Sequence, residues 1–211
     1  MKVILTGSTG FVGREILNQC LAHPAITSVV ALSRRELPQH DKLKVAVIED
    51  FLSYPESVRK DITGAEACIW TIGLIPSKVP KPDDGTAKRV SIEYTLAAAR
   101  VFQEVCQKPF RFVYVSGAGT ERDQSKSLWV MQDYRRIRGQ VETELLDFAG
   151  AHGDFKPYIM RPAMIISREM SLRSLIFGLG PSVKVDVLAE YMIELALKGG
   201  DKAIWENADM K

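Results

Sequence analysis

The sequence predicts an α/β fold with one doubly wound parallel sheet that is covered by helices on both faces. Two observations indicate this fold. Short apolar runs alternate with amphipathic runs along the chain, and the apolar runs are rich in β-branched residues with no polar face. The expected strands are Lys2–Thr6, Ser28–Leu32, Lys44–Ile48, Ala67–Ile72, Arg111–Ser116 and Pro157–Arg161, with Ala203–Trp205 as a further edge strand.

Helices are expected between these strands because apolar residues there recur at helical spacing. The sets are Val12, Ile16 and Cys20; Val90, Tyr94, Ala97, Val101 and Val105; Tyr134, Ile137, Val141, Leu145 and Phe148; and Leu188, Tyr191, Met192 and Leu195, followed by Gly199-Gly200. The strand-helix repetition predicts the doubly wound arrangement.

Length and composition predict a single domain over residues 1–211. The chain has 211 residues, of which 46% are hydrophobic and 26% are charged, as in one ordinary globular domain. Only 49 residues follow Pro162, so we expect a small substrate lobe at about residues 163–184. A lobe of this size disfavours a large sugar nucleotide as substrate.

The charge and the cysteine content narrow the classes of partner that the protein is expected to bind and the cell compartments in which it is expected. The formal net charge of +2 predicts a small-molecule substrate, with neither a nucleic acid nor a membrane as partner, and leaves a homodimer open. Cys20, Cys68 and Cys106 are far apart and form no CxxC pair, so no metal site is expected. Buried thiols and the absence of a leader before Lys2 favour the cytoplasm.

A glycine-rich turn follows the first expected strand and predicts a dinucleotide site. Gly7 allows the tight turn, Gly10 lets backbone N–H groups approach a pyrophosphate, and Gly13 lets the helix pack closely on the strand. The helix N-terminus then faces the anion. The residues expected to bind the cofactor here are Gly7, Ser8, Thr9, Gly10, Phe11, Val12 and Gly13.

The end of the second strand favours NADP(H) as the cofactor. NAD requires a carboxylate at this position for the ribose 2′-hydroxyl, whereas a 2′-phosphate requires cationic groups. The chain has Ser33, Arg34 and Arg35 there. Glu36 comes one step later and keeps NAD open.

Two further strand ends supply candidate cofactor contacts. After the third strand, Asp50 is expected to accept a hydrogen bond from the adenine amino group, and Phe51 is expected to border the ring. After the fourth strand, Thr71 is a candidate hydrogen-bonding group and Gly73 would allow close approach of the backbone to the cofactor.

The chain resembles atypical short-chain dehydrogenases/reductases, particularly the NmrA-like and Tat-interacting-protein-like branch of NAD(P)-binding Rossmann proteins. The similarity covers nearly the whole chain. It is carried by Thr6–Gly13, Ser33-Arg34-Arg35, Arg89–Thr95, Tyr134–Gly139, Arg161-Pro162 and Val187-Leu188-Ala189.

The resemblance implies a catalytic Tyr-x-x-x-Lys pair and a hydroxyl just beyond the fifth strand. The tyrosine is Tyr134, and Arg138 stands at the lysine position, one helical turn later on the same face. A cation beside a phenol favours the phenolate, but arginine and lysine are not interchangeable at such sites. The hydroxyl position falls on Gly117, which leaves Ser116 or Thr120 as substitutes.

The predicted function is NADPH-dependent reduction of a small or medium apolar carbonyl or enone, with the proton supplied or oriented by Tyr134. Substrate walls are assigned to Ile75, Trp129, Met131 and Phe177. The altered lysine and serine positions keep two alternatives open: an NADP(H)-binding redox sensor, and a non-redox isomerase or cyclase on the same fold.

Overall fold

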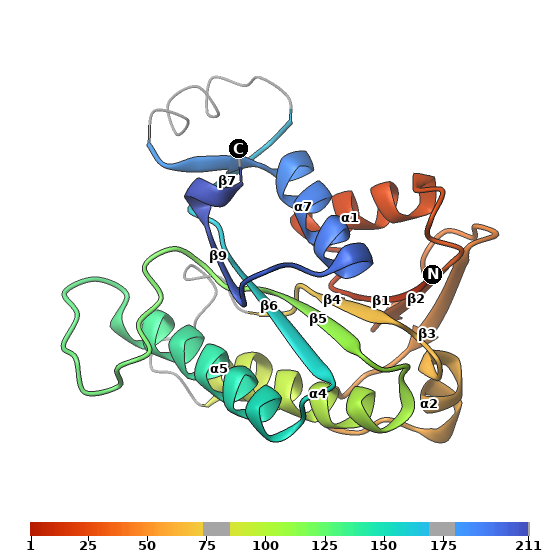
Figure 1. Cartoon of the computed structure of the whole chain (residues 1–211), viewed down its shortest axis with the longest axis horizontal. Helices are drawn as coiled ribbons and strands as arrows, with labels where there is room; N and C mark the ends of the chain where they lie inside the picture. Colours follow the sequence, from red (N-terminus) through yellow and green to blue (C-terminus); the bar gives the residue numbers. More distant parts are fainter. Residues whose placement is uncertain (74–84, 169–179, 211) are drawn as a thin grey trace.

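A seven-stranded parallel sheet forms the centre of the molecule, for which the computed structural model describes residues 1–73, 85–168 and 180–210 (Figure 1). The strands lie in the order β3-β2-β1-β4-β5-β6-β9, and each neighbouring pair is parallel. They are β1 (Lys2–Thr6), β2 (Ser28–Ser33), β3 (Leu43–Val47), β4 (Ala67–Trp70), β5 (Phe110–Val115), β6 (Phe155–Arg161) and β9 (Ile204–Glu206). The predicted fold class is confirmed.

Helices cover both faces of the sheet, as Figure 1 shows. One face carries α1 (Phe11–Ala22) and α7 (Val185–Lys198), and the other carries α2 (Glu56–Ile62), α4 (Tyr94–Val105) and α5 (Gln132–Ala151). The described residues also form three short helical segments: α3 (Thr86–Lys88), the π-helix η2 (Arg89–Glu93) and the 3-10 helix η3 (Asn207–Asp209).

The core forms two layers because successive strand residues point to opposite faces. On β4, Cys68 and Trp70 pack into the layer under α4 and α5, whereas Ala67 and Ile69 pack into the layer under α1 and α7. All four residues are buried, which explains why the strand is apolar on both faces. The three free cysteines are buried as well, as expected.

The strand boundaries differ from the expected ones where backbone hydrogen bonds stop. β4 ends at Trp70 rather than Ile72 because the Thr71 N–H donates to the Thr6 side-chain oxygen (3.1 Å) instead of continuing the ladder. β6 begins at Phe155, two residues early, because that residue pairs with Phe110 on β5.

A second, two-stranded parallel sheet joins β7 (Met164–Ile166) to β8 (Ser182–Lys184). Both strands lie within the segment expected to form a small lobe. β8 runs directly into α7, which packs across α1, so this pair is tied to the main domain through α7.

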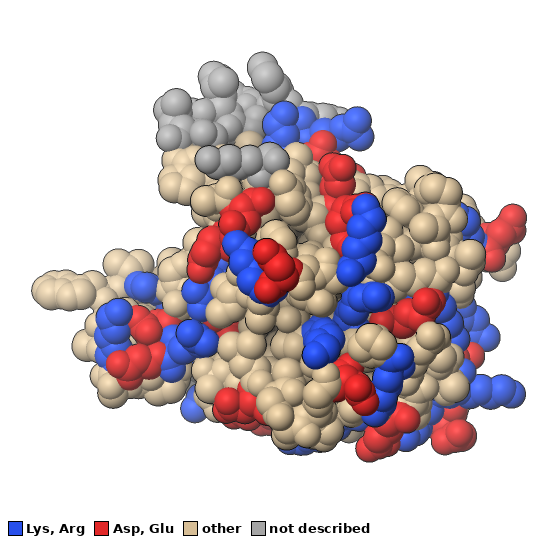
Figure 2. All heavy atoms as spheres, in the orientation of Figure 1, with Lys and Arg blue, Asp and Glu red and all other residues tan. Residues whose placement is uncertain are grey.

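Charged side chains of both signs are interspersed over the face drawn in Figure 2. This pattern agrees with the formal net charge of +2. Among the described residues, no helix is long and apolar enough to cross a bilayer.

Candidate functional site

The glycine turn connects β1 to α1 with the geometry that its sequence predicts. Gly7 has a φ of +69°, and the Gly10 N–H donates to the Gly7 carbonyl (2.9 Å). A Cβ at Gly13 would lie 2.1 Å from the Gly7 oxygen, so only glycine lets the helix approach the turn this closely.

The same turn also touches the end of β4. A Cβ at Gly7 would lie 2.2 Å from the Thr71 hydroxyl oxygen. That hydroxyl donates to the Thr6 carbonyl (2.7 Å), and the Thr71 N–H donates to the Thr6 hydroxyl oxygen (3.1 Å). Thr71 therefore ties β4 to β1 at the point where the strand order reverses, which is where open α/β sheets bind ligands.

The turn has polar groups that fit a nucleotide pyrophosphate. Ser8 is 3% exposed, and its Oγ has no hydrogen-bond partner within the described part of the chain. The N-cap of α1 is Gly10, which supplies no side-chain cap to the first turn of the helix. Unpaired N–H groups and the positive end of the helix dipole favour an anion at this place.

The end of β2 presents two exposed cations. Arg34 and Arg35 extend from the strand, and within the described residues neither guanidinium has an ion-pair partner. The Ser33 side chain is buried, and its Oγ accepts a hydrogen bond from the Arg35 N–H (3.2 Å), which fixes the turn.

The two candidates after β3 have different surroundings from those expected. Asp50 pairs with Arg89 (3.0 Å) and accepts from the Leu52 N–H; this hydrogen bond, together with Arg89, holds the pKa of Asp50 below its ordinary value. Phe51 is only 4% exposed and packs edge-on against Trp70 with ring centres 5.7 Å apart. The Phe51 ring is therefore part of the core, and its place beside the adenine ring stays a prediction.

Tyr134 and Arg138 lie together on the first turns of α5. The Arg138 Cζ is 5.4 Å from the centre of the Tyr134 ring, and the Arg138 side chain is 6% exposed. Its Nη1 donates to the Val115 carbonyl (2.6 Å) and to the Tyr114 hydroxyl (3.0 Å). Burial lowers the pKa of the guanidinium, but the two phenol oxygens raise it more, so Arg138 remains a cation.

Two glycines make room for this pair. A Cβ at Gly73 would lie 2.8 Å from Nη2 of Arg138, so the guanidinium lies directly on the glycine after β4. A Cβ at Gly117 would lie 3.7 Å from the Tyr134 hydroxyl oxygen. The position at which the resemblance expects a hydroxyl is therefore beside the phenol, but it carries no side chain.

Ser116 is beside this pair in sequence but its side chain points elsewhere. Its hydroxyl donates to Oε1 of Glu142 (2.5 Å), and the Thr120 hydroxyl lies 3.2 Å away. Thr120 in turn donates to the Gly117 carbonyl (2.6 Å). The Ser116 hydroxyl is therefore bound to a buried carboxylate, which corrects its expected part as the hydroxyl partner of Tyr134.

The expected substrate walls are not assembled within the described residues. Trp129 is fully exposed, and Met131, with a φ of +51°, is exposed before the first residue of α5. Trp129 and Met131 thus do not line an enclosed space. Ile75 and Phe177 lie outside the described residues.

The sequence patterns did not identify two residues beside the site, Tyr114 and Glu142. Tyr114 is a strand residue in an apolar run, which gave no sign that its hydroxyl meets Arg138. Glu142 did have a signal: Tyr134, Arg138 and Glu142 are spaced by four and so lie on one face of α5.

We expect Gly73→Ala to displace the Arg138 guanidinium, because the added methyl group would occupy its place. The overpacking should lower the free energy of unfolding by about 1–3 kcal/mol in urea titration. Gly153→Ala, at a position with no atom within 4 Å of the added carbon, is the control. Equal stability of the two variants would contradict the contact.

The chain matches a family model and several known relatives. A family model described as NAD(P)H-binding matches residues 7–172. Leucinostatins biosynthesis cluster protein T of Purpureocillium lilacinum is 34% identical over 122 residues, covering 56% of this chain and 44% of that protein. Protein fmp52-1, mitochondrial, of Aspergillus terreus is 30% identical over 167 residues, covering 78% of this chain and 66% of that protein. The chain spans less than two thirds of either relative.

Solved structures share the fold at low sequence identity. The reductase domain of PhqB from Penicillium fellutanum has a TM-score of 0.72 at 17% identity, covering 99% of this chain and 67% of that chain. A short-chain dehydrogenase/reductase from Saccharomyces cerevisiae has a TM-score of 0.71 at 14% identity, covering 99% and 96%. WbmF of Bordetella bronchiseptica, solved with NAD+, has a TM-score of 0.73 at 12% identity, covering 98% and 72%.

Proposed function

Because this chain belongs to the NAD(P)H-binding family, we propose that it is an NADPH-dependent reductase of a small or medium apolar carbonyl or enone. The observation that carries the proposal is the position of Tyr134. Its phenol oxygen lies beside Gly117, and its ring lies beside Arg138, at the carboxyl ends of β4 and β5. The matches to reductase-type proteins support the same class of reaction.

The short segment after β4 connects the glycine turn to the pair formed by Tyr134 and Arg138. Thr71 touches the glycine turn at Gly7, and Gly73, two residues later, touches Arg138. A dinucleotide whose pyrophosphate lies at the turn would therefore extend along this segment toward Tyr134. When bound, the reduced nicotinamide would supply the hydride.

The residues of this chain would hold the cofactor, donate the proton and keep the phenol in place. The backbone N–H groups of the first turn of α1 and the Ser8 hydroxyl would hold the pyrophosphate, because no side chain caps that turn and the Ser8 Oγ has no partner within the described residues. The Tyr134 hydroxyl would donate a proton to the carbonyl oxygen as that oxygen becomes negative. Arg138 would keep the phenol in place and stabilise its anion afterwards.

The preference for NADPH rests on the end of β2. We expect Arg34→Ala to remove most of an at least tenfold preference for NADPH over NADH, about 1.4 kcal/mol, because a 2′-phosphate loses its nearest cationic group. Isothermal titration calorimetry with both cofactors measures the effect. Arg100→Ala removes an exposed arginine from α4 and should change neither affinity. Equal affinities for NADPH and NADH in the parent protein would refute the preference.

One observation favours a second candidate, an NADP(H)-binding redox sensor. Nη1 of Arg138, at the position where the resemblance implies a lysine, donates to Val115 and Tyr114, which are groups of the protein itself. Incubation of the protein with NADPH and a panel of apolar ketones and enones separates the two functions. Stoichiometric NADPH oxidation supports the reductase; tight NADPH binding without oxidation supports the sensor. A non-redox isomerase would instead convert an enone while NADPH stays reduced.

The location in the cell is also a proposal. The even charge balance and the buried free cysteines favour the cytoplasm, a reducing compartment. Relatives from Aspergillus terreus and Candida albicans carry the word mitochondrial in their names, so fractionation of cells that express the natural protein must include mitochondria.

A further inference from the structure

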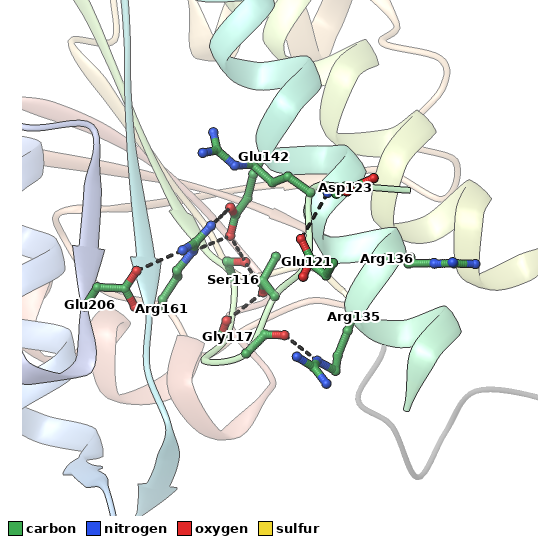
Figure 3. A network of polar contacts seen from close by, with 12 residues as sticks. Ser116, Gly117, Glu121, Asp123, Arg135, Arg136, Glu142, Arg161 and Glu206 are labelled. Atoms are coloured by element: carbon green, nitrogen blue, oxygen red, sulfur yellow. Dashed lines mark hydrogen bonds and ion pairs between the residues drawn. The ribbon is translucent and has the colours of Figure 1, made fainter. Parts of the chain in front are cut away.

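A polar network whose centre is buried joins α5 to β5, β6 and β9, about two helical turns beyond Tyr134 on α5 (Figure 3). Glu142 on α5 is its centre and is fully buried. The Glu142 carboxylate accepts the Ser116 hydroxyl and the Nε–H of Arg161 (3.0 Å), and it forms an ion pair with the same guanidinium. Arg161 also reaches the more exposed Glu206 on β9 (2.8 Å). The network therefore joins the site helix to three strands.

The free-energy cost of burying a carboxylate makes the arrangement of partners in this network specific. A carboxylate out of water is unfavourable unless it is paired and hydrogen-bonded, and Glu142 has both kinds of partner. The hydrogen bond and charge of Glu142 raise the pKa of Arg161 above its ordinary value, although burial opposes this. A displacement of Ser116 would leave a lone pair of Glu142 unsatisfied inside the protein.

Tyr134, Arg138 and Glu142 form one stripe along α5, and each lies beside a different residue at the end of β5. Glu142 binds Ser116, Arg138 binds Val115, and Tyr134 lies beside Gly117. The helix is thus aligned to the end of the strand at three points. The backbone beside Gly117 is fixed independently, because the Ser116 N–H donates to Met160 (2.8 Å) and the Ala118 N–H donates to Pro162 (2.8 Å).

We propose that Glu142 is a positioning residue for Tyr134, which acts by binding the Ser116 hydroxyl and so holding α5, and the phenol that this helix carries, against the fixed backbone at Gly117. This proposal rests on the proposed reductase function only for its kinetic consequence. The placement of the Tyr134 ring is a property of the protein without any ligand. Ser116 contributes to the reaction through Glu142 and the placement of α5, and no proton passes from it to the substrate.

The test uses Ser116→Ala, because Glu142→Gln also weakens the buried pair with Arg161 and endangers folding. A 3-fluorotyrosine placed at position 134 reports the ring by fluorine NMR, without NADPH. We expect one narrow signal in the parent and a broadened or divided signal in Ser116→Ala. Glu206→Gln is the matched control: it cuts the same network at its exposed end and should keep the parent spectrum.

Kinetics give the second readout. Ser116→Ala should lower kcat about ten- to hundredfold with unchanged NADPH affinity, as expected when a reacting group is misplaced. In a Tyr134→Phe background, the same substitution should cost no further activity, because its effect passes through the phenol. An equal loss in both backgrounds, or an unchanged fluorine signal in Ser116→Ala, would overturn the proposal. If the parent oxidises no NADPH, the reductase function fails, and the fluorine spectra alone decide the positioning role.

Discussion

Tyr134→Phe should lower NADPH-dependent turnover by about 10²- to 10⁴-fold, the range typical of a lost general acid. The phenylalanine ring can keep its contact with Arg138, whose Cζ lies 5.4 Å from the ring centre, so the fold should survive. Only the hydroxyl beside Gly117 is removed. NADPH affinity should therefore change little, and the loss should appear in kcat.

Steady-state kinetics with a substrate found in the carbonyl panel measure this result. Tyr191→Phe, which removes a hydroxyl from the half-buried face of α7, is the control and should keep the parent rate. Arg138→Lys adds a further comparison: activity is kept or raised if Arg138 acts as a charge beside the phenol. A Tyr134→Phe protein that works at the parent rate would require the proton to come from Thr120 or from water.

Gly10→Val should weaken NADPH binding more than a hundredfold while the sheet still folds. The added Cβ lies 3.2 Å from the Gly7 carbonyl oxygen, and no other non-neighbouring atom is within 4 Å of it, so the protein itself can accept the carbon. The branched side chain would instead stand before the N–H groups at the start of α1, where the pyrophosphate must approach.

Fluorescence titration with NADPH and circular dichroism together test this expectation. Gly150→Val adds the same side chain near the end of α5, where no atom lies within 4 Å of the added Cβ, and should keep the parent affinity. Gly13→Ala, unlike Gly10→Val, is expected to disturb the structure of the turn. Its Cβ would lie 2.1 Å from the Gly7 oxygen and would displace the turn itself. A folded Gly10→Val protein with parent affinity would show that the turn binds no phosphate.

The parts that could be predicted from sequence depend on local rules. The positions of β1 and α1 follow from an apolar run, a glycine turn and a helical repeat that are adjacent in the chain. The one-turn spacing of Tyr134 and Arg138 likewise fixes their common face without any knowledge of the sheet. Strand ends were less accurate, because β4 ends where the Thr71 N–H finds a side chain of β1.

The rest depends on packing between distant segments. An aromatic residue after a strand can turn either to the core or to a ligand, and Phe51 turns to the core because Trp70 offers an edge-on contact there. Ser116 was assigned to the phenol because it is one residue from Gly117, but its side chain points toward α5, where Glu142 is buried. No spacing rule relates residue 116 to residue 142 across 26 positions.

The contact between Gly73 and Arg138 restricts the order in which these two positions can change during evolution. A side chain at position 73 would meet the guanidinium at 2.8 Å, so it is acceptable only after residue 138 has become shorter or has turned away. If residue 138 changes first, a gap is left where the guanidinium was, but no atoms are forced together. A lineage that carries arginine at 138 is therefore held to glycine at 73, and residue 138 must change first.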